Sequence, residues 1–263
     1  MDRPYWHKQT QGEPLFPDLI WSRPENKRHA GKLLIIGGNA HGFAAPAEAF
    51  AAAEKAGAGT VRVGLPDSLQ KTVGVTFPAG EFAPSTPSGS FSKRALGELL
   101  NMSQWSDAVL LAGDFGHNSE TAVLLEKFVQ DYTGLLILTQ DAIDYFTSAA
   151  DSIVKRPNTL LALSFAQLQK LAAGAHFTIP FTFDMDLLRL VDALHDFTQR
   201  FSAHIIVKHL PTMFAAVDGQ VSTTKLAEDP DIWRVRAAAS AAVWWMQNPR
   251  KPFEAVTTSI VLV

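Results

Sequence analysis

Residues suited to contact a ligand follow a buried apolar segment near the N-terminus. Residues 32–36 are apolar apart from the first, and Gly37, Gly38 and Asn39 come directly after them. Glycine lacks a Cβ, so the backbone at this point can come close to a ligand. A helix expected to begin at Ala44 would direct its free amide groups toward an anion. The same glycines also suit a tight strand-to-helix turn, and this plainer interpretation stays open.

Three charged residues in the second half of the chain are candidates for chemistry. Lys208 follows the apolar segment 205–207 and suits either a phosphate contact or a solvated lysine. Asp229 and Asp231 precede a long helical pattern, where a fixed carboxylate could act as a general base. Acidic residues also favour helix starts, and Pro230 between them removes an amide donor. A helix cap or first-turn charge is therefore the favoured role for Asp231.

The elements that must position these residues alternate between strand and helix. Apolar segments at 32–36, 60–64, 107–112, 135–139, 159–163 and 205–207 predict strands. Patterns at 44–58, 119–131, 165–173, 184–201 and 231–246 predict helices. The pair Asp218-Gly219 predicts a hairpin between 213–217 and 220–224, residues 76–92 are predicted mainly as loop, and 257–263 as a last strand. This order predicts an α/β fold with a mostly parallel central sheet, helices on both faces and a late β-hairpin.

Ligands in such sheets bind at the carboxyl ends of the strands. Here those ends are 37–43, 113–118, 139–141, 164–167 and 208–212. Residues 1–30 are polar, contain proline and have no clear period, which favours a peripheral N-terminal arm. Residues 31–263 are predicted to form one α/β domain, since such folds reach this length as single units.

Composition excludes several classes of function. The net charge of −3 provides no basic surface for nucleic acid. There is no cysteine, and the eight histidines show no paired-ligand spacing, so we expect no metal site built by the protein. The N-terminus has no signal-peptide core and no apolar segment is long enough to cross a bilayer. We expect a cytoplasmic protein that contacts neither nucleic acid nor membrane.

Several segments together resemble a known enzyme family. The turn 29–39, the helix start Ala44-Ala-Pro46 and the helix end Ala56-Gly-Ala-Gly-Thr60 resemble the N-terminal core of the ADP/ATP-dependent NAD(P)H-hydrate dehydratases. Segments 107–116, 136–142, 160–171 and 205–219 follow in the family's order and spacing. The resemblance covers roughly residues 29–225 and implies the ribokinase-like fold.

The resemblance implies an activity and a set of binding residues. The activity is the dehydration of hydrated NADH or NADPH, driven by ATP or ADP, in a homo-oligomer. The nucleotide, with Mg²⁺, would bind near Lys208, His209 and Thr212. The dinucleotide substrate would bind near Gly37, Gly38, Asn39, Ala45, Gly116 and Asp141.

The chain departs from the family's motifs at each strand end. The family's Gly-Pro-Gly-Leu-Gly is Ala112-Gly-Asp-Phe-Gly116 here, and the Asp114 carboxylate should repel a dinucleotide's phosphates. Thr139 replaces the first aspartate of Asp-Ala-Asp, and Ser164-Phe-Ala-Gln167 replaces His-Pro-Gly-Glu. The glycine-rich Gly-Thr-Gly-Asp, which supplies the family's anion hole and catalytic base, corresponds to residues 225–236, which contain no glycine.

These departures leave the catalytic residues unassigned and the function divided between hypotheses. We expect a divergent relative, a pseudoenzyme with impaired or absent catalysis. A non-catalytic nucleotide-binding, structural or partner protein on the same scaffold is the alternative. A small-molecule kinase is weaker, because kinases of this fold need the same missing anion hole. Whether Asp229 or Asp231 replaces the base stays open.

Overall fold

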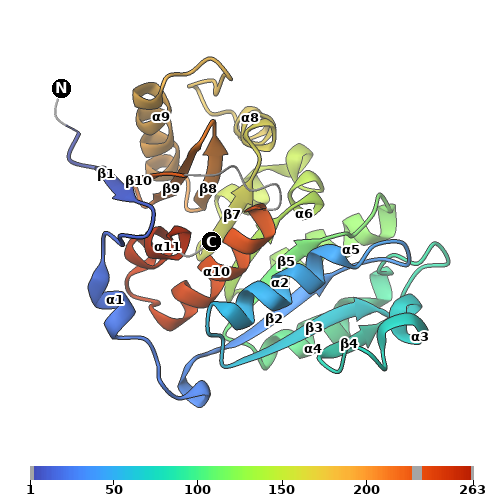
Figure 1. The fold of residues 1–263 in the computed structure, drawn as a ribbon. Coiled ribbons are helices and arrows are strands. Elements are labelled where there is room, and N and C mark those ends of the chain that lie inside the picture. Colours follow the sequence, from blue (N-terminus) through green and yellow to red (C-terminus); the bar gives the residue numbers. More distant parts are fainter. Residues whose placement is uncertain (1–2, 227–232, 262–263) are drawn as a thin grey trace.

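The computed structural model describes residues 3–226 and 233–261. Ten strands of this part of the chain form one sheet in the order β1-β10-β9-β8-β7-β6-β5-β2-β3-β4 (Figure 1). The strands are β1 (Trp6–Thr10), β2 (Lys32–Gly37), β3 (Thr60–Pro66), β4 (Gly80–Ala83), β5 (Ala108–Gly113), β6 (Leu135–Thr139), β7 (Thr159–Leu163), β8 (His204–His209), β9 (Thr212–Val217) and β10 (Gln220–Lys225).

The sheet is parallel from β4 to β8, and β9 runs antiparallel to both β8 and β10. Asp218 and Gly219 join β9 to β10 with positive φ angles of 47° and 79°. Two successive positive φ angles are what a two-residue type I′ hairpin requires. The mostly parallel α/β sheet and its late hairpin confirm the expected fold class.

Helices cover both faces of the sheet. They are α1 (Pro17–Trp21), α2 (Ala44–Lys55), α3 (Gln70–Val73), α4 (Leu96–Gln104), α5 (Ser119–Asp131), α6 (Asp141–Asp144), α7 (Asp151–Val154), α8 (Phe165–Gly174), α9 (Leu187–Arg200), α10 (Trp233–Gln247) and α11 (Pro252–Ile260). Short 3₁₀ turns lie at Lys27–His29, Asp67–Leu69, Lys93–Ala95 and Thr147–Ala149. No helix in the described residues is long and apolar enough to cross a membrane.

Alternation along β2 explains how one strand serves two cores. Leu33 and Ile35 are fully buried in the core beneath α2, α10 and α11. Leu34 and Ile36 are fully buried in the core on the opposite face, with α4, α5, α8 and α9. A strand with helices on both faces has no solvated side, so its sequence is apolar without interruption. Figure 1 shows α2 and α10 side by side on the first of these faces.

The predicted last strand at 257–263 is wrong, because the helix α11 occupies Pro252–Ile260. The β-branched residues of this segment are typical of strands, but Pro252 fits the first turn of a helix. The helix is also fixed from its buried side, where Thr257 Oγ1 hydrogen-bonds Ser222 Oγ at 2.9 Å. The loop predicted at 76–92 also contains the short edge strand β4.

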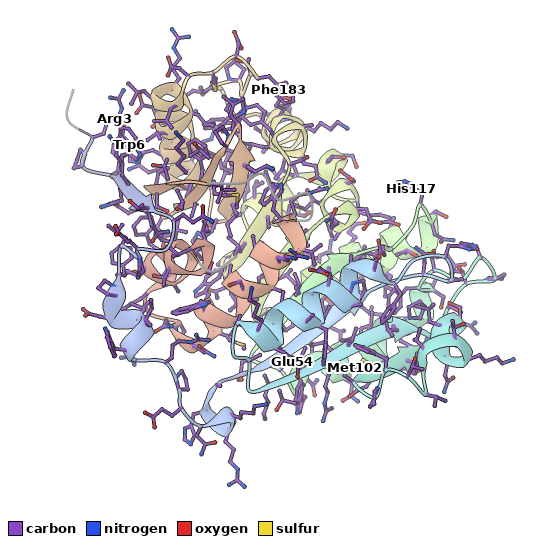
Figure 2. The ribbon with its side chains drawn as sticks, viewed as in Figure 1. Arg3, Trp6, Glu54, Met102, His117 and Phe183 are labelled. Atoms are coloured by element: carbon purple, nitrogen blue, oxygen red, sulfur yellow. The ribbon has the colours of Figure 1, made fainter. Side chains whose placement is uncertain are left out.

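The N-terminal arm contributes a strand to the sheet. Within it, β1 pairs in parallel with β10, with Trp6 opposite Val221. Arg3 donates to both carboxylate oxygens of Asp192 on α9, at 2.6 and 2.8 Å, and Tyr5 Oη donates to the same carboxylate at 2.6 Å. The arm is therefore bound to the rest of the domain by both backbone and side-chain hydrogen bonds. Figure 2 labels Arg3 and Trp6 of the arm.

Candidate functional site

The parallel strands bring the predicted ligand-binding segments to one edge of the sheet. In the neighbouring strands β2, β5, β6, β7 and β8, the carboxyl ends point the same way. The segments after them are the glycine turn 37–39, the loop 114–116, the start of α6, the start of α8 and the end of β8. We call this line of residues the strand edge, with an α2 half beside β2 and β5 and a β8 half beside β7 and β8.

The glycine turn after β2 is shaped by its contact with β5. A Cβ on Gly37 would collide with the carbonyl oxygen of Gly113, so no larger residue fits there. Gly38 adopts a φ of 91° and donates its amide to Gly113 O at 3.0 Å. Asn39 and Gly42 then form a small backbone bridge. Close packing of two strands therefore explains both glycines without a ligand.

The Asp114 side chain accepts a hydrogen bond from a backbone amide at the start of α2. Its carboxylate Oδ2 accepts a hydrogen bond from Ala45 N at 2.7 Å, and Asn39 Nδ2 donates to Asp114 O at 2.6 Å. Asp114 has a φ of 60°, a left-handed conformation that non-glycine residues rarely adopt. A helix N-terminus with free amides attracts anions, and here the chain's own carboxylate holds that position.

Asp141 and Gly116 form the second contact of the α2 half. Gly116 N donates to Asp141 Oδ2 at 3.2 Å, while Asp141 Oδ1 is buried without a hydrogen-bond partner in the described residues. Burial raises the pKa of the Asp141 carboxyl, and the nearby Asp114 charge adds to this effect. Tyr145 Oη donates to Gly116 O, which fixes the loop from its other side. Gly37, Gly38, Asn39, Ala45, Gly116 and Asp141 thus lie close together, and their role in binding stays a prediction.

Gln167 connects the two halves of the strand edge. Its Nε2 donates to Gln140 O at 2.8 Å and to Asp144 Oδ1 at 3.0 Å. With Ser164 it also forms a capping box at the start of α8, since each side chain accepts from the other residue's backbone amide. Residues 164–167, which stand where the resembled family has His-Pro-Gly-Glu, therefore cap α8 and supply the side chain that hydrogen-bonds the neighbouring α6 segment.

Arg234 on the first turn of α10 reaches this network. Its Nη1 donates to Gln167 Oε1 at 3.0 Å. Burial lowers the pKa of Arg234, and the charges of Asp144 and Asp141 act in the opposite direction. Arg234 is not among the residues predicted from the sequence, although an arginine at a helix start, where the macrodipole disfavours cations, is a signal of an unusual role.

The β8 half is more open and richer in rings. His209 is 8% exposed, its ring centroid lies 4.5 Å from that of Phe165, and its Nε2 has no hydrogen-bond partner among the described residues. Lys208 lies beside it with Nζ 5.8 Å from the Trp233 ring centroid. Thr212 pairs with His209 across the β8–β9 turn. The three predicted nucleotide contacts are therefore adjacent.

Phe183 extends this ring cluster into solvent. It lies in the segment between α8 and α9, where Figure 2 labels it, and its ring centroid is 4.9 Å from that of Phe165. The residue is 63% exposed, which is unusual for a large apolar side chain. The exposed Phe183 ring can stack on a planar group, and the imidazole of His209, which contacts the shared neighbour Phe165, can form a hydrogen bond with it. No periodicity in the sequence points to Phe183.

Binding of a metal ion, or action as a general base, would also need suitable side chains at the strand edge. No group of three metal-ligating side chains lies close enough to hold an ion within residues 3–226 and 233–261. Mg²⁺ that arrives on nucleotide phosphates needs few protein ligands, so the edge remains compatible with such an ion. Asp229 and Asp231, the candidate replacements for the base, lie outside the described residues.

Sequence comparison identifies distant relatives. No protein-family model matches the chain. The bifunctional NAD(P)H-hydrate repair enzyme of Salinibacter ruber is 24% identical over 208 residues, 76% of this chain and 36% of that protein. The corresponding enzyme of Methanothermobacter thermautotrophicus is 29% identical over 121 residues, 45% of this chain and 23% of that protein. The chain thus matches about a third or less of each relative's length.

Structure comparison confirms the ribokinase-like fold. A ribokinase-like superfamily protein from Enterococcus faecalis superposes with a TM-score of 0.75 at 14% identity, covering 99% of this chain and 87% of that one. The ADP/ATP-dependent NAD(P)H-hydrate dehydratase of Bacillus subtilis, co-crystallised with ATP and Mg²⁺, gives 0.66 at 12% identity, covering 94% and 86%. The chain has the ribokinase-like fold and is similar in part of its sequence to the NAD(P)H-hydrate repair enzymes.

Proposed function

We propose that this protein is a nucleotide-binding pseudoenzyme of the NAD(P)H-hydrate dehydratase family, with impaired or absent dehydratase activity. The observation that carries the proposal is the 2.7 Å hydrogen bond from Ala45 N to the Asp114 carboxylate. Through this bond, the carboxylate of Asp114 occupies the position where the family resemblance implies that the dinucleotide substrate binds.

The charge of the α2 half opposes a dinucleotide. Asp114, Asp141 and Asp144 are close enough for the charges of Asp114 and Asp144 to raise the pKa of Asp141. A substrate phosphate about 5 Å from one such carboxylate would meet a repulsion on the order of 3 kcal/mol at an effective dielectric constant near 20. That repulsion weakens binding by a factor of about 100. Arg234 offsets part of it, but its guanidinium is already bonded to Gln167.

The β8 half supports nucleotide binding. Lys208 supplies a positive charge, His209 a buried ring nitrogen that no described residue hydrogen-bonds, and Phe183 an exposed ring. Together these groups suit the phosphates and the planar base of ATP or ADP, with Mg²⁺ carried by the phosphates. A cytoplasmic location and a homo-oligomeric state stay predictions.

Calorimetric titration with ADP, ATP and NADPH tests the proposal. We expect ADP or ATP to bind with a dissociation constant below about 1 mM. The variant His209→Ala should weaken this binding at least about threefold, because it removes the unsatisfied nitrogen. The matched control His29→Ala changes an exposed histidine outside the strand edge and should have no effect.

The outcome separates nucleotide binding from a purely structural role. Absence of heat with both nucleotides at millimolar concentration would remove the nucleotide-binding part of the proposal and favour a structural or partner protein. NADPH binding tighter than ADP binding would contradict the assignment of the α2 half as closed to dinucleotides.

A further inference from the structure

A groove between α2 and α10 lies apart from the strand edge. It encloses a cavity of about 470 Å³, a size typical of small-molecule sites. Its lining includes Glu48 and Lys55 of α2, Arg236 and Ser240 of α10, and Arg23 from the turn after α1. None of these residues belongs to the strand edge, so the groove is a second candidate site.

Small side chains open the groove and make its floor apolar. Glu48, Ala52 and Lys55 recur at helical spacing and therefore share one face of α2. Arg236, Ser240 and Trp244 do the same on α10, four residues apart. Alanine and serine where the two helices face each other leave space that larger residues would fill. The lining thus has charged ends over an alanine floor.

The charges of the lining are unbalanced. Arg236 forms an ion pair with Glu48, and these two charges offset each other. Arg23 donates to Ala56 O, where the helix C-terminus partly compensates its charge. Lys55 is exposed and makes no ion pair within the part of the chain that the structure describes. Three cations against one carboxylate leave the groove positive in a chain whose net charge is −3.

Trp244 provides a second observation at the same end of the groove. The Arg23 guanidinium lies over its ring, with Cζ 4.8 Å from the ring centroid. The indole is fully buried, and its Nε1 has no hydrogen-bond partner among the described residues. A cation held over an aromatic ring is fixed in orientation, so less conformational freedom is lost when a ligand binds it.

We propose that this groove binds a small organic anion, with a single phosphate or carboxylate group on a flat apolar body. The anionic group would lie between Lys55 and Arg23, and the apolar body would cross Ala52 toward Ser240. The proposal is independent of nucleotide binding at the strand edge.

Titration of the full chain with 1-naphthyl phosphate, 1-naphthoate, 1-naphthol and inorganic phosphate tests this site. At about 50 mM salt, where surface charges are weakly screened, we expect one of the two aromatic anions to bind below about 1 mM. The two anions distinguish phosphate from carboxylate recognition. 1-Naphthol and inorganic phosphate should each bind at least about tenfold more weakly, since each lacks one half of the ligand.

Two variants locate the binding. Ala52→Phe should abolish it by filling the groove, and Lys55→Gln should weaken it about threefold, as expected for an exposed ion pair. The control Lys71→Gln on α3 should bind as the wild type does, and saturating ADP should not displace the ligand. Absence of saturable binding, equal binding of 1-naphthol, or wild-type affinity in both groove variants at unchanged thermal midpoints would overturn the proposal.

Discussion

Substitutions at Asp114 test whether this residue holds the start of α2. Its carboxylate accepts from Ala45 N at 2.7 Å, and its backbone has a φ of 60°. These two features act in opposite directions. The hydrogen bond and the interaction with the helix dipole stabilise the native state by about 1–2 kcal/mol. The left-handed backbone costs about 1 kcal/mol in a residue other than glycine.

The three informative variants separate these contributions. Asp114→Ala loses the bond and keeps the same backbone strain, so it should destabilise the protein by about 1–2 kcal/mol. Asp114→Gly loses the bond but relieves the strain, so the net loss should be at most about 1 kcal/mol, smaller than that of Asp114→Ala. Asp114→Asn keeps an acceptor and a side chain that tolerates this conformation, and should lose about 0.5–1 kcal/mol.

Urea unfolding followed by tryptophan fluorescence measures these free energies. The control Glu126→Ala changes an exposed carboxylate on α5 and should stay within about 0.5 kcal/mol of the wild type. An Asp114→Ala variant that unfolds at the wild-type urea concentration would refute the assigned role. The same result would remove the main structural reason for treating the α2 half as occupied.

Three further predictions concern other charged residues. Asp141→Asn should stabilise by about 1 kcal/mol at pH 7, because the raised pKa means that the buried charged form is disfavoured. This gain should vanish as the pH falls toward the ordinary carboxyl value of 3.8, which thermal unfolding at several pH values would show. Arg234→Met should destabilise by about 1–2 kcal/mol in urea unfolding, because Gln167 and Asp144 lose a half-buried cationic neighbour; a change within error would contradict the network. Hydrogen bonding from Arg3 lowers the pKa of Asp192 below its ordinary value. Acidification through this lowered pKa should protonate Asp192 and break the contact that holds the N-terminal arm. In the Asp192→Asn variant, the β1 amides should undergo hydrogen exchange faster than in the wild type at pH 7. An unchanged exchange rate would exclude a role of Asp192 in holding the arm.

The position of the strand edge was predictable from the sequence because it follows from topology. Apolar segments that end in glycine or polar residues, separated by helices, require parallel strands whose carboxyl ends meet. Gly37, Gly116, Asp141 and Lys208 therefore had to lie along one line. The order and direction of the strands are sufficient to explain this placement.

The chemistry along that edge was less predictable. The sequence predicts that Asp114 repels a ligand, but the bond from Ala45 to Asp114 depends on a left-handed backbone that no spacing reveals. Arg234 and Gln167 meet only through the packing of α10 against the start of α8. The segment 257–263 was misassigned because β-branched residues are also tolerated in a helix whose buried side is well packed.

The most direct test of the central claim is the rate at which the protein dehydrates hydrated NADPH with ATP or ADP and Mg²⁺. The dehydratase of Bacillus subtilis, assayed in parallel, is the reference. With the α2 half filled by Asp114, we predict a kcat/KM at least about 100-fold below the reference, the loss expected when a key anion-stabilising group is missing. A kcat/KM within about tenfold of the reference, a difference of only 1.4 kcal/mol in barrier, would contradict the account.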